Sequence, residues 1–364
     1  EPEEIQKRIG WALKEVEMSK MVNENVYNLS EGQKQRVAIA ANLSILPEVL
    51  VLDEPTSNLD PQGAHQLFNI LDKLKNKGKT IILIDHRTQY ALKTADKIII
   101  MDKGNIIMEC GPNLLEDVQI RKKFGIRNPN YRNRNIHHQT NKKKPKILEI
   151  KDLNFVHSNG FKLQDISLDL NQGEVLGVVG NNGSGKTTLA SLIAGLLKIK
   201  NGKIKIYSAD GRKNSQKDYQ VGMVLQNPDH QLFMDSVYNE LAFGLDEMGL
   251  TSEEIQKEIQ NVLDSMNLWQ LKDRHPHSLS GGEKQRTLIS ALMARKPDLL
   301  ILDEPTTGMD GYHMDKLVTE IKNLSASGVS IILISHDMEF MDKSCDKLVY
   351  LEQGHLSTKE SVFL

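Results

Sequence analysis

Cysteine is scarce in this chain of 364 residues. Only Cys110 and Cys345 are present; they lie far apart and lack the spacing of metal ligands, which argues against a disulfide framework and indicates a reducing compartment. Long hydrophobic runs are also missing, because none approaches the roughly 18 residues of a bilayer-spanning helix. The acidic start, Glu1–Glu4, has the wrong charge for a secretory signal. These absences predict a cytoplasmic setting, with any membrane role supplied by a partner.

Acidic residues are absent from one long stretch, although the chain as a whole has a net charge of −2. Residues 118–148 carry ten basic side chains: Arg121, Lys122, Lys123, Arg127, Arg132, Arg134, Lys142, Lys143, Lys144 and Lys146. We interpret residues 119–146 as a solvated connector. The alternatives are contacts with an anionic membrane surface or with RNA. The chain is also longer than a single hydrophobic core usually supports, which predicts two domains.

The chain contains an internal repeat with a constant offset of 250 residues. The offset relates Leu29–Arg36 to Leu279–Arg286, Asp53–Thr56 to Asp303–Thr306, Asp60 to Asp310, His86 to His336, and Glu3–Lys7 to Glu253–Lys257. Residue 1 then corresponds to Thr251, in the middle of the second copy. We therefore expect residues 1–118 to be the C-terminal part of a first domain, of which about 100 residues are missing here. Residues 147–364 are expected to form a complete second domain.

A phosphate-binding loop is predicted between a strand and a helix. Its residues are Gly180, Asn181, Asn182, Gly183, Ser184, Gly185, Lys186, Thr187 and Thr188. The apolar run Val175–Val179 before it is typical of a buried parallel strand, and Thr188–Leu197 favours a helix. Glycines let successive N–H groups face the phosphates of ATP, while Lys186 would bridge to the outer phosphates and Thr187 would offer its hydroxyl to Mg²⁺. The alternative is a glycine-rich turn without a ligand.

Two further strands should bring catalytic side chains to the same edge of the sheet. Leu299–Leu302 ends in Asp303 and Glu304, which would hold the metal and act on the attacking water. A pair of acids at a helix N-terminus is the alternative. His336 follows the predicted strand Val329–Ile334, and its counterpart follows the equivalent strand of the first copy. This match favours a γ-phosphate contact over a structural histidine.

The motif Leu279–Glu283, placed between the phosphate loop and Asp303–Glu304, resembles the signature of the ATP-binding cassette (ABC) ATPase family. The resemblance implies an α/β P-loop NTPase with a RecA-like core, present as tandem ABC domains. It also implies an antiparallel β subdomain near Ile147–Leu170 and Ile204–Tyr207, and an inserted helical subdomain at about Ser236–His277. The implied ligands are ATP and Mg²⁺.

The same resemblance assigns roles to individual residues. Gln226 would reach the metal and the attacking water, residues 307–310 would form the D-loop, His336 would be the switch histidine, and His157 would stack on adenine. Two cassettes of this family close head to tail, so the loop at Lys186 would face the signature of the first copy. The implied partners there are Ser30, Gly32 and Gln33, with Glu31 in place of the usual glycine. The reciprocal site would use Ser280 and Gly282 with Glu54 and His86, and its P-loop is expected to be among the missing residues. Gly281 and Glu283 would complete the second signature, Asp53 would be the Walker B aspartate of the first copy, and Asp60 and Asp310 would belong to the D-loops.

After Gln226, the segment Asn227–Phe233 resembles the ATPases of energy-coupling factor (ECF) importers. That resemblance implies a separate integral membrane subunit, docked on the Gln226 loop and the helical subdomain at the cytoplasmic face of the membrane, and uptake of a vitamin, metal or similar micronutrient. We expect Asp229 to meet a basic helix of that subunit. Alternatively, Asp229 and Gln231 are ordinary turn and cap residues.

A different class, the soluble twin-cassette ATPases that act on ribosomes, stays open. We rank it lower, because clustered cysteines are absent and Asn133–Asn141 has no helical period. Nucleic acid is accordingly not the favoured partner.

Overall fold

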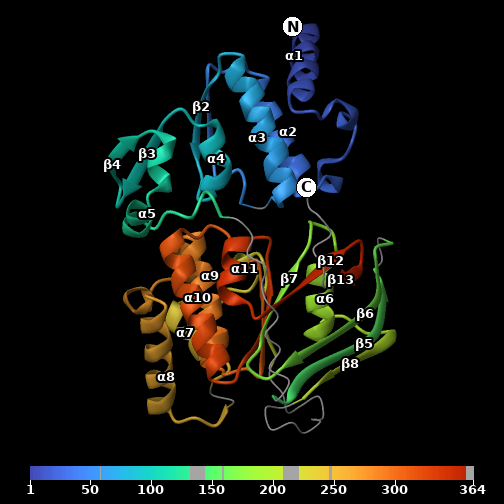
Figure 1. The fold of residues 1–364 in the computed structure, drawn as a ribbon, viewed down its shortest axis with the longest axis vertical. Coiled ribbons are helices and arrows are strands. Elements are labelled where there is room, and N and C mark those ends of the chain that lie inside the picture. Colours follow the sequence, from blue (N-terminus) through green and yellow to red (C-terminus); the bar gives the residue numbers. More distant parts are fainter. Residues whose placement is uncertain (58, 132–143, 158–159, 208–220, 246–247, 358–364) are drawn as a thin grey trace. The chain divides into compact units, whose positions relative to one another are not determined.

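The structure is a computed structural model that describes residues 1–364 apart from 58, 132–143, 158–159, 208–220, 246–247 and 358–364 (Figure 1). The chain divides into two compact units. Unit 1 comprises residues 1–132 with 310–312, and unit 2 comprises 133–309 with 313–364.

Unit 2 is built on a six-stranded mixed sheet with the order β13-β12-β7-β11-β10-β9. Its strands are β7 (Val175–Val179), β9 (Val221–Val224), β10 (Leu299–Asp303), β11 (Ser330–Ile334), β12 (Lys347–Glu352) and β13 (His355–Ser357). All neighbours pair in parallel except β12 and β13. Every residue of β7, β10 and β11 is buried, as expected for central parallel strands covered on both faces. The segments after β7, β9, β10 and β11 therefore leave the sheet at one edge.

Alternate side chains of the central strands enter two different hydrophobic cores. Leu299 and Ile301 pack with a three-stranded antiparallel sheet and helix α6. Leu300 and Leu302 pack in the other core, which contains α10, α11 and the helices of the helical subdomain described below. The antiparallel strands are β5 (Lys146–Val156), β6 (Lys162–Asn171) and β8 (Asn201–Ile206), and the helices are α6 (Lys186–Ile193), α10 (Gly311–Ala326) and α11 (Met338–Ser344). The period of two residues per strand thus builds a layer on each face of the sheet.

The predicted helical subdomain is present. It consists of the short helix α7 (Val237–Ala242), α8 (Ser252–Ser265), the 3₁₀ turns η6 (Trp269–Leu271) and η7 (Pro276–Ser278), and the first part of α9 (Gly281–Ala294). A capping box formed by Thr251 and Glu254 begins α8. The apolar residues expected on one face of this helix, Ile255, Ile259, Val262, Leu263 and Met266, are all buried in one core.

Unit 1 repeats the second half of unit 2 at the same offset. Its elements are α1 (Pro2–Glu15), η1 (Ser19–Met21), η2 (Val26–Asn28), α2 (Glu31–Leu43), β1 (Val49–Asp53), α3 (Pro61–Asn76), β2 (Thr80–Ile84), α4 (Thr88–Thr94), β3 (Ile98–Asp102) and β4 (Asn105–Cys110). Even the left-handed residues recur, since positive φ angles occur at Glu17 and Asn267 and at Glu54 and Glu304. The predicted repeat is therefore structural as well as sequential.

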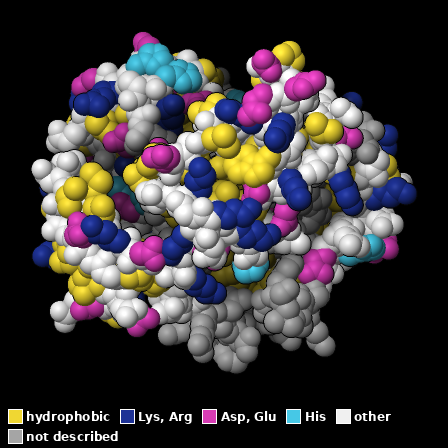
Figure 2. All heavy atoms as spheres, turned by 90° about the horizontal axis from the view of Figure 1, so that it is seen from above, with side chains coloured by type: hydrophobic (Ala, Val, Ile, Leu, Met, Phe, Trp, Pro, Cys, Tyr) yellow, Lys and Arg dark blue, Asp and Glu magenta, His cyan; other side chains and the backbone are white. Residues whose placement is uncertain are grey.

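The two copies differ in how their central strands are covered. In unit 1, β1 and β2 form a parallel pair, and Val51 and Ile82 are 60% and 50% exposed. Their counterparts Ile301 and Ile332 are 0% and 1% exposed, because the core that includes α6 and the antiparallel sheet covers them. On the face drawn in Figure 2, exposed hydrophobic side chains lie in separate groups among charged ones.

The region expected to be a connector begins with a helix. Helix α5 (Val118–Phe124) follows the 3₁₀ turn η3 (Pro112–Glu116); Asp117 caps its start, and Gly125 ends it with φ of 63°. The basic residues Arg121, Lys122 and Lys123 lie in its last turn, where positive charge favours a helix C-terminus. Most of the remaining stretch, residues 132–143, lies outside the described residues.

None of the helices in the described part of the chain has the length and apolar character that crossing a bilayer requires.

Candidate functional site

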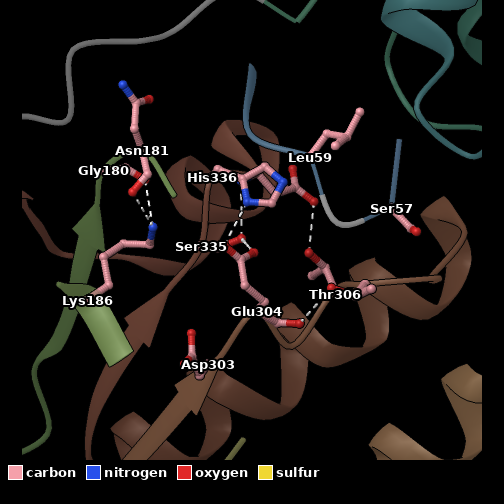
Figure 3. Close-up of polar contacts among 12 residues, drawn as sticks. Ser57, Leu59, Gly180, Asn181, Lys186, Asp303, Glu304, Thr306, Ser335 and His336 are labelled. Carbon is pink, nitrogen blue, oxygen red and sulfur yellow. Dashed lines mark hydrogen bonds and ion pairs between the residues drawn. The ribbon is translucent and has the colours of Figure 1, made fainter. Parts of the chain in front are cut away.

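The predicted phosphate loop joins β7 to α6 at the carboxyl edge of the sheet. Lys186, the first residue of α6, is 7% exposed. Its Nζ donates hydrogen bonds to the carbonyl oxygens of Gly180 (2.7 Å) and Asn181 (3.0 Å), so the side chain folds back under the loop (Figure 3). The ammonium group is thereby held beside the N-terminus of α6, where a phosphate is also favoured.

Glycine is required at two positions of the loop for different reasons. Gly185 has φ of 104°, and a Cβ there would lie 2.6 Å from Cζ of Phe161. At Gly180, a Cβ would collide with the carbonyl oxygen of Leu351. Between them, the Ser184 Oγ is buried and has no hydrogen-bond partner among the described residues. An unpaired buried hydroxyl is costly, and phosphate oxygens at this loop would satisfy it.

Asp303 closes the site from the end of β10. The Thr187 Oγ1 donates a 2.6 Å hydrogen bond to the Asp303 Oδ2. Burial raises the pKa of Asp303 to about 6, against the lowering effects of the Thr187 hydrogen bond and the Lys186 charge. The described residues hold no group of three His, Cys, Asp or Glu side chains suited to a metal ion. Mg²⁺ needs no such group, because phosphates and waters usually supply most of its ligands. The Thr187 hydroxyl and the Asp303 carboxylate are the kind of oxygen ligands that Mg²⁺ prefers.

Glu304 lies at the centre of the site and is buried, as are its two partners. Its Oε2 accepts a 2.9 Å hydrogen bond from the Ser335 Oγ, and its Oε1 is 2.6 Å from the His336 Nδ1 (Figure 3). Burial alone would raise the pKa of Glu304, but His336, Lys186 and Ser335 together lower it. The backbone of Glu304 is left-handed, with φ of 49°. A non-glycine residue in this conformation is uncommon and is found at functional sites.

The segment after β9 is a braced loop. Gln226 is exposed, and the loop behind it is closed by Gln231, whose side chain accepts from the Leu225 N–H (2.7 Å) and donates to the Met223 carbonyl (2.9 Å). Beyond the loop, Phe233 and Phe243 pack edge to face with ring centres 5.0 Å apart. They help to line a cavity of about 170 Å³; its other lining residues are Met223, Val224, Gln231, Glu240, Leu288, Ala291, Leu292 and Arg295.

Comparison with known proteins identifies the architecture around this site. A family model described as ABC transporter matches residues 2–57 and 163–307. An ABC transporter ATP-binding protein of Methanosarcina mazei is 35% identical over 97% of this chain and 68% of its own length, and one of Caldanaerobacter subterraneus is 34% identical over 97% and 70%. The chain belongs to the ABC transporter family. It is an ABC-type ATPase, and the nucleotide of that family is ATP.

Solved structures agree with this ABC fold. The cbiO1 protein of Clostridium perfringens, part of the ABC transporter complex cbiONQ, is 32% identical, with a TM-score of 0.52 over 59% of this chain and 88% of its own. A structure of ribosome-bound archaeal Pelota and ABCE1 gives a TM-score of 0.72 over 97% of this chain and 60% of that chain, at 24% identity. The second likeness shows the fold alone. The chain spans about two thirds of the length of the curated relatives described above.

Both ABC signature motifs begin a helix. In unit 2, the Glu283 carboxylate accepts hydrogen bonds from the Ser280 N–H and Oγ, each at 2.8 Å, and Gly281 and Gly282 form the first turn of α9. In unit 1, Ser30 and Gln33 form the equivalent capping box around Gly32. The start of a helix is a place where backbone N–H groups can bind a phosphate. The pairing of these signature motifs with a P-loop across the two copies stays a prediction.

The first copy preserves the acid–histidine pair of the ABC site. The Glu54 Oε1 is 3.1 Å from the His86 Nε2, and both side chains are partly exposed. Their hydrogen bond lowers the pKa of Glu54 and raises that of His86. Asp53 ends β1, and Asp60 caps α3 by accepting from the Gly63 N–H (2.7 Å).

The structure therefore gathers the core of the predicted site in unit 2. Lys186 and Thr187 at the start of α6, Asp303 and Glu304 at the end of β10, and His336 after β11 lie together. His157 lies beyond the end of β5, with its ring centre 6.3 Å from that of Phe155, and Asp310 directly precedes α10.

Sequence reasoning missed the role of Ser335. Its only signal was its position beside His336 at the end of an apolar strand.

Proposed function

We propose that this chain is the ATP-binding and ATP-hydrolysing part of an ECF-type importer, which couples hydrolysis to uptake of a micronutrient through a separate membrane subunit. The observation that carries the ATPase step is the convergence of Lys186, Thr187, Asp303 and Glu304 at one sheet edge. The importer assignment rests on the segment 227–233 and on the likeness to cbiO1.

In this proposal, the phosphates of ATP replace the loop carbonyls as partners of Lys186, and Ser184 gains a partner. Glu304 accepts a proton from the attacking water, while Ser335 and His336 hold its carboxylate in place and His336 can contact the γ-phosphate. Gln226 orients the same water from the neighbouring loop.

Thr187 and Asp303 would hold Mg²⁺, and Gln226 would reach the ion from the loop after β9, the strand that pairs with β10. The ion, when bound, stabilises negative charge on the phosphates. Because burial disfavours ionised Asp303, a bound cation would favour its carboxylate form.

We further propose that the membrane subunit docks at Phe233 and Phe243. These aromatic side chains are 62% and 47% exposed, and the cavity they line lies between the loop after β9 and helices α7 and α9. Exposed aromatic side chains over a hollow are typical anchors of protein interfaces.

Asp229 is a poorer candidate for that docking surface than the sequence suggested. Its carboxylate already accepts a 2.7 Å hydrogen bond from the Lys284 Nζ, so Asp229→Arg would disturb unit 2 itself. Phe233 contacts Phe243 but forms no ion pair and is 62% exposed, so its substitution is the cleaner test.

The test is copurification of the tagged protein from native membranes. Phe233→Asp should remove an integral membrane partner while ATP binding at Lys186 persists. Leu196→Asp, at a residue 65% exposed, is the matched control and should retain the partner. Recovery of ribosomal particles without a membrane partner, fading with salt, would overturn the importer proposal in favour of the ribosome-associated class.

A further inference from the structure

The loop after β9 is joined to the signature helix by an ion pair. Asp229 lies in the single 3₁₀ turn η4 (Pro228–His230), and Lys284 lies in the first turn of α9. Their 2.7 Å contact leaves the Lys284 side chain 15% exposed and that of Asp229 49% exposed. The His277 Nδ1, from the turn just before the signature, is 3.6 Å from the same carboxylate oxygen. The Lys284 hydrogen bond lowers the pKa of Asp229, which favours its carboxylate form.

Both ends of this pair are firmly anchored. On one side, the Asn227 side chain accepts from the Asp229 N–H (3.0 Å), and Gln231 ties the loop to β9. On the other side, Lys284 is one residue from Glu283, which holds Ser280. A displacement of Asp229 therefore acts on Lys284, whose neighbour Glu283 holds the signature residue Ser280.

The internal repeat shows why Lys284 is free to reach Asp229. In the first copy, the equivalent Lys34 pairs at 2.8 Å with Glu31 of its own helix. In the second copy, position 281 is glycine, so no carboxylate three residues before Lys284 competes for it. The same lysine thus serves a local pair in one copy and a longer-range contact in the other.

We propose that the Asp229–Lys284 pair is a latch that makes the Gln226 loop and the signature at Ser280 move as one element. The inference rests on the proposed ATPase, in which Gln226 responds to ATP on its own P-loop while Ser280 serves the ATP of a partnering cassette. Asp229 and Lys284 are then positioning residues that carry the presence of one nucleotide to the other site.

Hydrogen exchange of the chain, at a concentration where sedimentation shows a monomer, tests the latch. Asp229→Asn and Lys284→Met should each raise amide exchange several-fold in residues 225–231 and in 279–284 alike, and the double variant should add nothing further. In the background Glu304→Gln, saturating Mg-ATP should protect both segments, and each latch variant should lose the protection of 279–284 alone.

Charge reversal separates the latch from a general loss of stability. The pair Asp229→Lys with Lys284→Asp should restore ATP-induced protection of 279–284. Lys272→Met, which removes a surface pair with Asp273 in the same subdomain, should change neither segment. Exchange that rises in 225–231 but not in 279–284, or protection that survives both single variants, overturns the latch. Absence of any ATP binding contradicts the proposed function instead, and the nucleotide-free comparison still decides the latch.

Discussion

At the scale of single residues, the chemistry depends on how Glu304 is held. Ser335 and His336 contact both carboxylate oxygens, and the lowered pKa of Glu304 favours the carboxylate, which is the form that can accept a proton. The equivalent Glu54 has a histidine partner but is far more exposed, so its surroundings restrain it less. The burial of the acid, rather than its presence, distinguishes the two copies.

Replacing Glu304 by glutamine removes the proton acceptor while nearly preserving shape. We expect ATP binding to persist and hydrolysis to fall by about 10²- to 10⁴-fold, or roughly 2.7 to 5.4 kcal/mol at the barrier. A single-turnover assay with ATP binding measured in parallel checks this. Turnover within threefold of the parent protein would exclude Glu304 as the base.

At the scale of elements, the loop between β7 and α6 is shaped by glycine conformation. Gly185→Ala combines a positive φ with a contact against Phe161, so unfolding free energy should drop by about 2 to 5 kcal/mol. Gly183 also has a positive φ, of 80°, but open space around it; its alanine variant should lose only about 1 to 2 kcal/mol. Thermal unfolding without nucleotide measures both, and equal losses would refute the packing argument.

The antiparallel sheet carries an acid-sensitive cluster on β5. Hydrogen bonds from Lys151 and Lys146 lower the pKa of Glu149 from 4.5 to about 2. Because the folded-state pKa is depressed, its stabilising effect is complete above about 4.5 and disappears as pH falls towards 2. Glu149→Gln should therefore be less stable than the parent near neutral pH, with the gap closing in acid. A gap that does not change with pH would show that the lysines do not act on Glu149 through charge.

Most elements of unit 2 were predictable from the sequence, because buried parallel strands and P-loops have strong local patterns. The strand predicted at Val175–Val179 has the same bounds as β7. The helical spacing of apolar residues correctly predicted which face of α8 is buried. Helix α5 was missed, because its basic residues were interpreted as solvated connector rather than as favourable charges at a helix end. The Asp229–Lys284 pair could not be predicted, since it joins residues 55 apart and depends on tertiary packing.

At the scale of the whole molecule, apolar side chains on one face of β1 and β2 are exposed, and we expect another segment to pack on them. Unit 2 shows what such a cover is, because the core that includes α6 and the antiparallel sheet buries the equivalent residues there. We propose that a P-loop-bearing segment of the same kind covers the face in the working protein, and that this chain alone self-associates and hydrolyses ATP slowly.

A matched pair of variants tests that exposure. Ile82→Lys should reduce self-association without loss of folding, because the side chain is half exposed. The equivalent Ile332→Lys should unfold unit 2, since it buries an unpaired charge. Light scattering and circular dichroism distinguish these outcomes. If Ile82→Lys unfolds the chain as readily, the face is covered and the account of unit 1 is wrong.

The central claim is that unit 2 binds ATP through Lys186, and equilibrium titration of the chain with Mg-ATP tests it most directly. We predict one ATP per chain, since the described residues contain one P-loop, at Gly180–Thr187. Lys186→Ala should weaken binding by about 10- to 150-fold, the range for loss of a hydrogen bond to a charged group. The control Lys198→Ala, at an exposed lysine beyond α6, should bind like the parent. Equal affinity of the parent and Lys186→Ala would contradict the account.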